Sequence, residues 1–220
     1  MSDVIVGKDV GYGQTKSWCS DGRSVRYPSL AARVGNDVMA SQVKPNFIDR
    51  TRQKWLVGEQ ARFAGAEYPM VDSSYITDPE YMVLACHALT RLGLKKAKVV
   101  MGLPILRFEQ QKDILLRQIK TWPEITGIEF DVLKVLPQPM GAVLDICYDE
   151  NGQPKPELEE LMSKRIVIID CGQGTTDQVE VYHGVPHTQN HDSVQVGISD
   201  VFDRVRLFLE TRKQYTPSAD

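Results

Sequence analysis

The sequence predicts an α/β fold in which the element order β-β-β-α-β-α-β-α occurs once in full and then begins again without finishing. Three observations predict this fold. The apolar stretches Val4–Asp9 and Arg165–Asp170 each end in an aspartate and run into a glycine-x-glycine-x-threonine turn. Each turn leads into two further strand-like stretches. Between the two copies, strand patterns alternate with helix patterns, which is typical of a sheet covered by helices.

Length, composition and charge indicate a soluble globular protein. The chain has 220 residues, enough for one large or two modest domains, with 42% hydrophobic and 25% charged residues. Its net charge of -3 argues against direct binding of nucleic acid or an anionic membrane. We find no apolar run of the about 20 residues that a membrane span needs, and no signal segment. The four cysteines are scattered, so we expect a cytoplasmic protein with reduced thiols rather than a zinc site or a disulfide scaffold.

The first copy begins with three strands. Val4–Asp9 is apolar and β-branched, and Gln14–Cys19 follows the glycine turn. Asp21-Gly22 is a strong hairpin signal and leads into the strand Arg23–Tyr27. Residues 28–78 have a mixed pattern, which we interpret as a small inserted subdomain.

Alternating helices and strands complete the first copy. Asp78 is a good N-cap, Pro79 suits the first helical position, and Gly93 is placed to end a helix that we expect to be buried on most sides. Strands are expected at 98–101 and 128–136. Between them an amphipathic helix carries Phe108, Leu115, Ile119 and Trp122 and is expected to end at Pro123, and 138–148 is also expected to be helical.

A polar loop at 149–156 separates the two copies. After it we expect the strands Arg165–Asp170 and Thr176–Tyr182, an extended stretch to Val196, and a helix capped by Ser199. We therefore expect a first domain at 1–138, with the inserted subdomain at about 28–78, and the start of a second domain at 139–220.

Both turns have the chemistry of a phosphate site. Glycine is expected because such turns visit positive φ and because a side chain would block a ligand. Successive N–H groups form an anion-binding nest, and a neighbouring aspartate suits a hydrated Mg²⁺. Lys16 adds a positive charge in the first copy, and Thr175 and Thr176 add hydroxyls in the second. One such turn is most often an ordinary hairpin, but two copies at equivalent places favour phosphate binding.

Four motifs in order resemble the superfamily of actin, heat-shock chaperones and sugar kinases. Residues 9–16 (DVGYGQTK) and 170–177 (DCGQGTTD) are similar to its two phosphate motifs. Gly102-Leu103-Pro104 and the segment 136–142 (LPQPMGA) resemble a strand end and the segment that connects the two domains. Within the superfamily the chain resembles the prokaryotic actin-like proteins, especially the ParM-like group that segregates plasmids. The resemblance implies a duplicated, ribonuclease H-like fold.

The resemblance also implies that ATP·Mg²⁺ lies in a cleft between two domains, with one hairpin from each domain holding the phosphates. It assigns Asp9 and Asp170 to the metal and Gln138, with Asp170, to catalysis, Gln138 by orienting the attacking water. The residues that it implies for cofactor binding are Asp9, Gly11, Tyr12, Gly13, Gln14, Thr15, Lys16, Gly172, Gln173, Gly174, Thr175 and Thr176.

The second copy lacks its later strands and helices. The apolar strand Arg165–Asp170 is therefore expected on an open sheet edge, where it invites pairing with another chain. We expect a C-terminally truncated chain in which ATP binding is weakened and hydrolysis is in doubt, or a chain whose sheet is completed by a swapped or paired oligomer.

Three functions remain open on the sequence. The first is an actin-like ATPase whose nucleotide state controls filaments, which move plasmid DNA through an adaptor protein. The second is a small-molecule kinase or exopolyphosphatase of the same superfamily. The third is a truncated chain that binds or caps the filaments of a relative without catalysis. The sequence does not identify the cargo, the filament geometry or the choice between ATP and GTP.

Overall fold

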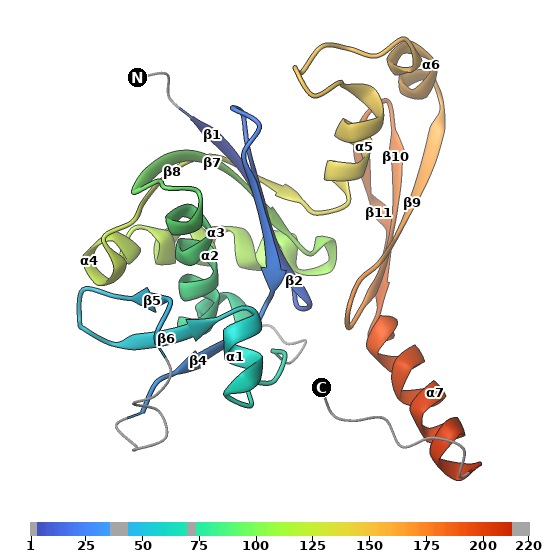
Figure 1. The fold of residues 1–220 in the computed structure, drawn as a ribbon. Coiled ribbons are helices and arrows are strands. Elements are labelled where there is room, and N and C mark those ends of the chain that lie inside the picture. Colours follow the sequence, from blue (N-terminus) through green and yellow to red (C-terminus); the bar gives the residue numbers. More distant parts are fainter. Residues whose placement is uncertain (1–3, 36–43, 70–73, 213–220) are drawn as a thin grey trace. The chain divides into compact units, whose positions relative to one another are not determined.

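The computed structural model describes residues 4–35, 44–69 and 74–212, and the chain divides into two compact units, 1–141 and 142–220 (Figure 1). Parts of the expected inserted subdomain, residues 36–43 and 70–73, lie outside the described residues. None of the helices within the described ranges is both long and apolar enough to cross a bilayer.

A five-stranded sheet forms the centre of unit 1, in the order β3-β2-β1-β7-β8. Its strands are β1 (Ile5–Val10), β2 (Gln14–Cys19), β3 (Ser24–Pro28), β7 (Lys96–Leu103) and β8 (Glu129–Pro137). The first three strands pair antiparallel, whereas β7 runs parallel to both β1 and β8. Because β1, β7 and β8 are parallel, their carboxyl ends lie at one edge of the sheet.

Three helices and their apolar side chains build the main core of unit 1. They are α2 (Pro79–Arg91), α3 (Phe108–Ile119) and α4 (Trp122–Thr126), with the 3-10 turn η3 (Ile105–Arg107) before α3. Every residue of α2 from Tyr81 to Leu89 is buried, as its apolar sequence predicts. Trp122 packs between Tyr81 and Phe130, with ring centroids 6.2 and 5.2 Å away.

The expected end of the amphipathic helix at Pro123 is wrong. The helix α3 already ends at Ile119, and Pro123 lies in the first turn of the separate helix α4. Proline is tolerated in a first turn because the N–H that it lacks has no intrahelical partner there. Gly127, at φ 76°, ends α4.

A second, small sheet in unit 1 has the order β4-β6-β5 and belongs to the inserted segment. Its strands are β4 (Ala31–Arg33), β5 (Phe47–Ile48) and β6 (Lys54–Val57), followed by α1 (Glu59–Phe63) and the 3-10 turn η2 (Tyr75–Thr77). Successive side chains along β6 point to opposite faces of this sheet, so the two faces have different neighbours. Leu56 packs with Ala61 of α1, whereas Trp55 and Val57 belong to the main core.

Unit 2 contains a three-stranded antiparallel sheet in the order β11-β10-β9. Its elements are β9 (Arg165–Cys171), β10 (Thr176–Tyr182), β11 (Val185–Val194), α6 (Glu157–Ser163) and α7 (Ile198–Thr211), and α5 (Met140–Cys147) spans the division between the units. As expected, β9 lies at the edge of this sheet in the described part of the chain. Val167 and Ile169 on β9 are 54% and 65% exposed, and no residue of α7 is buried.

Candidate functional site

The first glycine turn joins β1 to β2 and is closed by a hydrogen bond of 3.1 Å from the N–H of Gly11 to the carbonyl oxygen of Gln14. Gly11 does not take the positive φ that we expected. Space is limited there, because a Cβ on Gly11 would lie 3.2 Å from the oxygen of Gln14, a tight contact. The strand register places Lys16 opposite Asp9, with Nζ 3.6 Å from Oδ2.

Gln138 reaches the same place from the far end of the unit. Its Nε2 donates a hydrogen bond of 2.6 Å to Oδ1 of Asp9, across 129 residues of sequence. The backbone N–H of Gln138 donates to the carbonyl oxygen of Leu103 on β7, at 2.8 Å. Three predicted site residues, Asp9, Lys16 and Gln138, therefore meet beside one turn at the edge where the parallel strands of unit 1 end.

Gly102, the residue before Leu103, makes room for Gln138. A Cβ on Gly102 would lie 2.9 Å from Cγ of Gln138, closer than carbon atoms approach. The position of Gly102 in the Gly102-Leu103-Pro104 motif therefore needs a residue without a side chain. It lets the chain after β8 pass close enough for Gln138 to reach Asp9.

We expect Gly102→Ala to displace Gln138 and to break its hydrogen bond to the carboxylate of Asp9. Binding of Mg·ATP, the ligand that the sequence resemblance implies, should then weaken by about 10-fold or more, the equivalent of about 1.5 kcal/mol for a hydrogen bond to a charged group. Isothermal titration calorimetry measures this change. Gly7→Ala is the matched control, because Gly7 lies on β1 and the nearest atom to an added Cβ is 3.9 Å away. Equal affinities for the two variants would contradict the role assigned to Gly102.

Two residues that the sequence did not single out, Tyr75 and Arg107, support the first turn. The ring of Tyr75 stacks on Tyr12 at 5.0 Å, and its Oη donates to the carbonyl oxygen of Gly11 at 3.4 Å. Burial raises the pKa of Tyr75, so its hydroxyl stays a neutral donor at physiological pH. Arg107 donates from Nη1 to Oη of Tyr12 at 3.4 Å. The sequence marks Tyr75 and Arg107 only by their residue types, since tyrosine and arginine often line ligand-binding sites.

Thr15 differs from the other residues predicted for cofactor binding in the first turn. Its side chain is fully buried, and its hydroxyl shares a hydrogen bond of 3.0 Å with Ser29. Alternation along β2 turns Thr15 into the core and Gln14 and Lys16 to the other face. The hydroxyl of Thr15 therefore supports the hairpin and is not available to a ligand.

The second turn, in unit 2, repeats the geometry of the first. The N–H of Gly172 donates to the carbonyl oxygen of Thr175 at 2.8 Å, and a Cβ on Gly172 would lie 3.2 Å from that oxygen. Asp170 is exposed and stands opposite Asp177 in the register of β9 and β10. Asp177 takes the place that Lys16 has in the first hairpin, so this turn carries no cation of its own.

The hydroxyl groups of the second turn are held by its neighbours. Thr175 donates from Oγ1 to Oδ2 of Asp177 at 3.3 Å, and Thr176 donates from Oγ1 to the carbonyl oxygen of Val196 at 2.8 Å. The carbonyl oxygen of Gln173 accepts hydrogen bonds from the N–H and the hydroxyl of Ser199, at 3.0 and 2.7 Å. Gly174, between these residues, is half-buried.

The expected capping of α7 by Ser199 is wrong. The N-cap is Gly197, two residues before Ser199, and the helix begins at Ile198. The N–H of Gly197 donates to Oδ2 of Asp200 at 2.8 Å. A Cβ on Gly197 would lie 2.3 Å from the oxygen of Gln173, so only glycine fits there. The hydroxyl of Ser199 is used to attach the turn to the helix.

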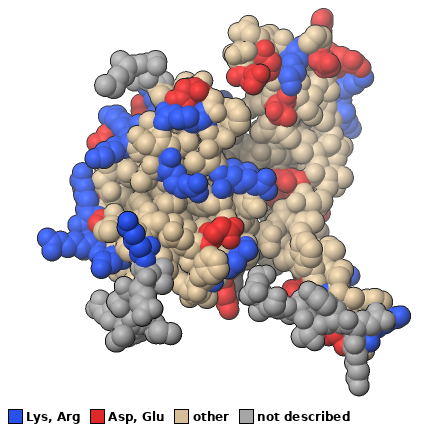
Figure 2. Space-filling model, viewed as in Figure 1, with Lys and Arg blue, Asp and Glu red and all other residues tan. Residues whose placement is uncertain are grey.

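Within the described ranges, no group of three or more His, Cys, Asp and Glu side chains is placed to hold a metal ion. Mg²⁺ needs no such group, because it takes one or two carboxylates and completes its shell with water and phosphate. The carboxylate of Asp9 beside the first turn and, separately, that of Asp170 beside the second are of the type that Mg²⁺ takes. Lys and Arg side chains also form a row across the visible face of unit 1, which favours an anionic ligand there (Figure 2).

The chain is similar to actin-like proteins in sequence. Residues 7–141, more than half of the chain, match the family model described as the N-terminal domain of actin-like proteins. An archaeal actin homolog from Thermoplasma acidophilum is 24% identical, over 90% of this chain and 64% of its own length. The chain therefore spans less than two thirds of the length of this relative.

Solved structures show the same fold. The crystal structure of an archaeal actin homolog in complex with ADP matches with a TM-score of 0.69 and 22% identity, covering 99% of this chain and 68% of that chain. A ParM filament from Clostridium botulinum matches with a TM-score of 0.70 and 20% identity, covering 99% and 72%. At these identities the likeness is one of fold.

Proposed function

The chain belongs to the family of actin-like proteins, and we propose that it binds ATP with Mg²⁺ and assembles into filaments whose growth the nucleotide controls. The observation that carries this proposal is the meeting of Asp9, Lys16 and Gln138 beside the first glycine turn. A glycine turn without bulky side chains and an ammonium group suit a phosphate, a carboxylate suits its metal ion, and an amide suits a water molecule. The solved homolog in complex with ADP supports a nucleotide as the ligand.

Each group has a distinct role in this proposal. The backbone of the turn 11–14 and the ammonium group of Lys16 bind phosphate oxygens. Asp9 holds Mg²⁺ through water. The amide of Gln138 is a poor base but is well placed to orient a water molecule, and hydrolysis of ATP depends mostly on such positioning.

We propose that the second turn binds phosphate as well. Asp170 would hold the metal, and the backbone of 172–176 would face the phosphates. The support is the equal geometry of the two turns, each closed by a hydrogen bond from its first glycine to the residue three positions later. The assignment of Asp170 to catalysis rests on the family resemblance, as does the proposal that the filament moves plasmid DNA through an adaptor protein.

One observation favours a second candidate function, that of a chain which binds filaments of a relative without hydrolysing ATP. Unit 2 exposes the apolar side chains of Val167, Ile169, Phe202 and Phe208, each more than half exposed. Val167 and Ile169 lie two residues apart on β9 and therefore share one face of the strand, and neighbouring exposed apolar side chains mark interaction surfaces.

Light scattering and high-speed pelleting distinguish the two candidates. For the first, we expect the protein to pellet with Mg·ATP and to stay in the supernatant with Mg·ADP or with ATP and EDTA. Co-pelleting only with filaments of a full-length actin-like protein, whatever the nucleotide, would support the second. A soluble protein that neither binds nucleotide by calorimetry nor co-pellets would contradict both.

A further inference from the structure

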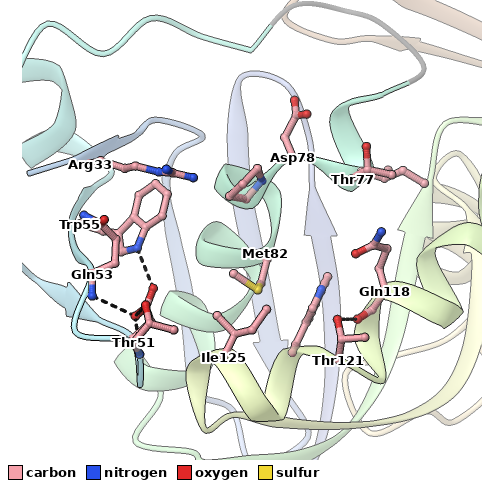
Figure 3. Close-up of a pocket in the computed structure, with 14 residues that line it drawn as sticks. Arg33, Thr51, Gln53, Trp55, Thr77, Asp78, Met82, Gln118, Thr121 and Ile125 are labelled. Carbon is pink, nitrogen blue, oxygen red and sulfur yellow. Dashed lines mark hydrogen bonds between the residues drawn. The ribbon is translucent and has the colours of Figure 1, made fainter.

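Two cavities border the small sheet β4-β6-β5, and they differ in the state of their polar groups. The first, of about 310 Å³, has an apolar wall that includes Trp55 and Met82 (Figure 3). The buried Asp49 in its wall accepts hydrogen bonds from Thr51, Gln53 and Trp55 at 2.6–3.2 Å. Within the described residues, no buried side-chain polar atom of this cavity lacks a partner. Its polar groups are therefore satisfied without a ligand.

The second cavity, of about 580 Å³, lies beside β3, the edge strand of the five-stranded sheet in the described part of the chain. The strand β3 contributes Arg26 and Tyr27 to its lining, and α2 contributes His87 and Arg91. The start of α1 contributes Glu59. This volume is within the size range of small-molecule sites.

The lining of the second cavity carries more positive than negative charge. Arg26 and Arg91 have no acidic partner among the described residues, and Nε of Arg26 donates to the neutral amide oxygen of Gln14. Glu59 is the acidic residue of the lining, and its Oε2 already lies 3.5 Å from Nη1 of Arg62. Two guanidinium groups are therefore available to an anion.

His87 adds a buried polar group to the same lining. It is 5% exposed, and its Nδ1 has no hydrogen-bond partner in the part of the chain that the structure describes. Burial lowers the pKa of His87 to about 4, and the charges of Arg91 and Lys8 act in the same direction. The ring is therefore neutral at physiological pH, with one donor and one acceptor nitrogen. Because most buried polar atoms have a partner, an unpartnered imidazole at a cavity wall favours a polar ligand.

The wall around these groups is preformed. The hydroxyl of Tyr27 donates to the carbonyl oxygen of Leu84 at 2.5 Å. The side-chain amide of Asn46 both donates to and accepts from the backbone of Val57, at 2.9 Å each. Gly58, at φ 69°, lies so close to β3 that an added Cβ would be 3.2 Å from Cβ of Tyr27. Little conformational freedom is therefore lost when a ligand enters.

We propose that the second cavity binds a small phosphate monoester, with Arg26 and Arg91 contacting the phosphate group. Such a group carries about two negative charges at pH 7 and therefore matches two guanidinium groups. Guanidinium N–H groups bind phosphate oxygens in pairs, with a fixed geometry. Free phosphate has the same chemistry, but it would leave most of the cavity beside Tyr27 and Pro28 unfilled.

The second cavity is distinct from the candidate nucleotide site at the first glycine turn. Asp9, Lys16 and Gln138 are not among the described residues that line it. Gln14 belongs to both places, because its carbonyl oxygen closes the turn and its side-chain oxygen accepts from Arg26. Binding of a phosphate monoester in this cavity goes beyond the proposed function and does not depend on it.

Isothermal titration calorimetry with glycerol 3-phosphate tests the role of the arginines. Arg91→Gln should raise the Kd about tenfold or more, because a hydrogen bond between charged groups is lost. Arg117→Gln is the matched control and should bind like the wild type, since Arg117 is also an exposed arginine in the last turn of a helix, α3, but does not line the cavity. Equal affinities for the two variants, or no binding by the wild type, would overturn the inference. Inorganic phosphate should bind more weakly than glycerol 3-phosphate, and equal affinity would contradict a monoester as the ligand.

Imidazole NMR tests where glycerol 3-phosphate binds. His87 is the one histidine of unit 1, and the other three histidines belong to unit 2. The ligand should shift the ring signals of His87, which the variant His87→Gln identifies, and leave the other three unchanged. The shift should persist with saturating Mg·ADP. Its loss would place the anion at the first turn and overturn the inference. The shift in a protein that does not bind Mg·ATP would support the cavity site and contradict only the proposed function.

Discussion

Asp9→Asn should reduce the affinity for Mg·ATP by about 10- to 100-fold, the equivalent of about 1.5–3 kcal/mol for an interaction of a charged group. Asparagine keeps the shape of the side chain and an oxygen that accepts the hydrogen bond from Nε2 of Gln138. The substitution removes the negative charge that attracts Mg²⁺ and Lys16. The loss therefore reports on charge rather than on the fold of the turn.

Calorimetry with and without Mg²⁺ isolates this effect. With EDTA the affinity of the variant for ATP should equal or exceed that of the wild type, because one carboxylate no longer repels the phosphates. Asp131→Asn, an exposed carboxylate on β8 of the same sheet, is the control and should bind like the wild type. An equal loss with and without Mg²⁺ would mean that Asp9 shapes the turn and does not hold the metal.

Lys8→Met should remove a pH dependence from the stability of unit 1. Lys8 precedes Asp9 on β1, but alternation turns its side chain into the core, where it is 4% exposed. Its Nζ donates to Oγ of Ser17 at 3.1 Å and to the carbonyl oxygen of Ala85 at 2.7 Å. Burial lowers the pKa of Lys8 to about 7, although Cys86, Cys19 and Asp9 act in the opposite direction.

The direction of the pH dependence follows from the two pKa values of this lysine. Between about pH 7 and 10.5 the unfolded chain holds a proton on Lys8 that the folded chain has lost. The free energy of unfolding therefore rises with pH, by up to about 1.4 kcal/mol per pH unit, and the contribution is lost as the pH falls towards 7. Burial raises the pKa of Cys86, Tyr27 and Tyr81, which lowers stability only as the pH approaches about 9 and above.

Urea unfolding of the wild type and of Lys8→Met at pH 6.5, 7.5 and 8.5 isolates Lys8 as the difference between the two proteins. His87, Cys19 and Cys86, whose pKa values burial also shifts, are present in both. The three tryptophans, Trp18, Trp55 and Trp122, all belong to unit 1, so their fluorescence follows this unit alone. Lys8→Met should be more stable than the wild type at pH 6.5 by about 1–3 kcal/mol, with the difference shrinking as the pH rises. Lys134 is an exposed lysine on β8, and Lys134→Met should change neither the free energy of unfolding nor its dependence on pH. A difference that stays constant from pH 6.5 to 8.5 would contradict the titration of Lys8.

Local elements were predicted well because their signals lie within a few residues. The Asp21-Gly22 hairpin, the proline start of α2 and both glycine turns form where the sequence places them. The predicted α/β fold and the membership of the prokaryotic actin-like proteins are confirmed by the family match and the solved structures. Three local predictions were wrong: the helix end at Pro123, the helix cap at Ser199 and the positive φ at Gly11. In each case the conformation depends on neighbouring residues that the local sequence pattern does not reveal.

The sequence alone determined the repeated aspartate-glycine turn and the family, because a turn is specified by the residues that form it. Only the tertiary structure decided that Gln138 contacts Asp9, that Lys8 is buried and that Phe63 is exposed. Contacts across 129 residues depend on the order and register of parallel strands, and burial depends on which elements pack together. The physical reason is that the hydrophobic effect is non-directional. The local sequence therefore does not determine whether a given phenylalanine or lysine side chain will be buried or exposed.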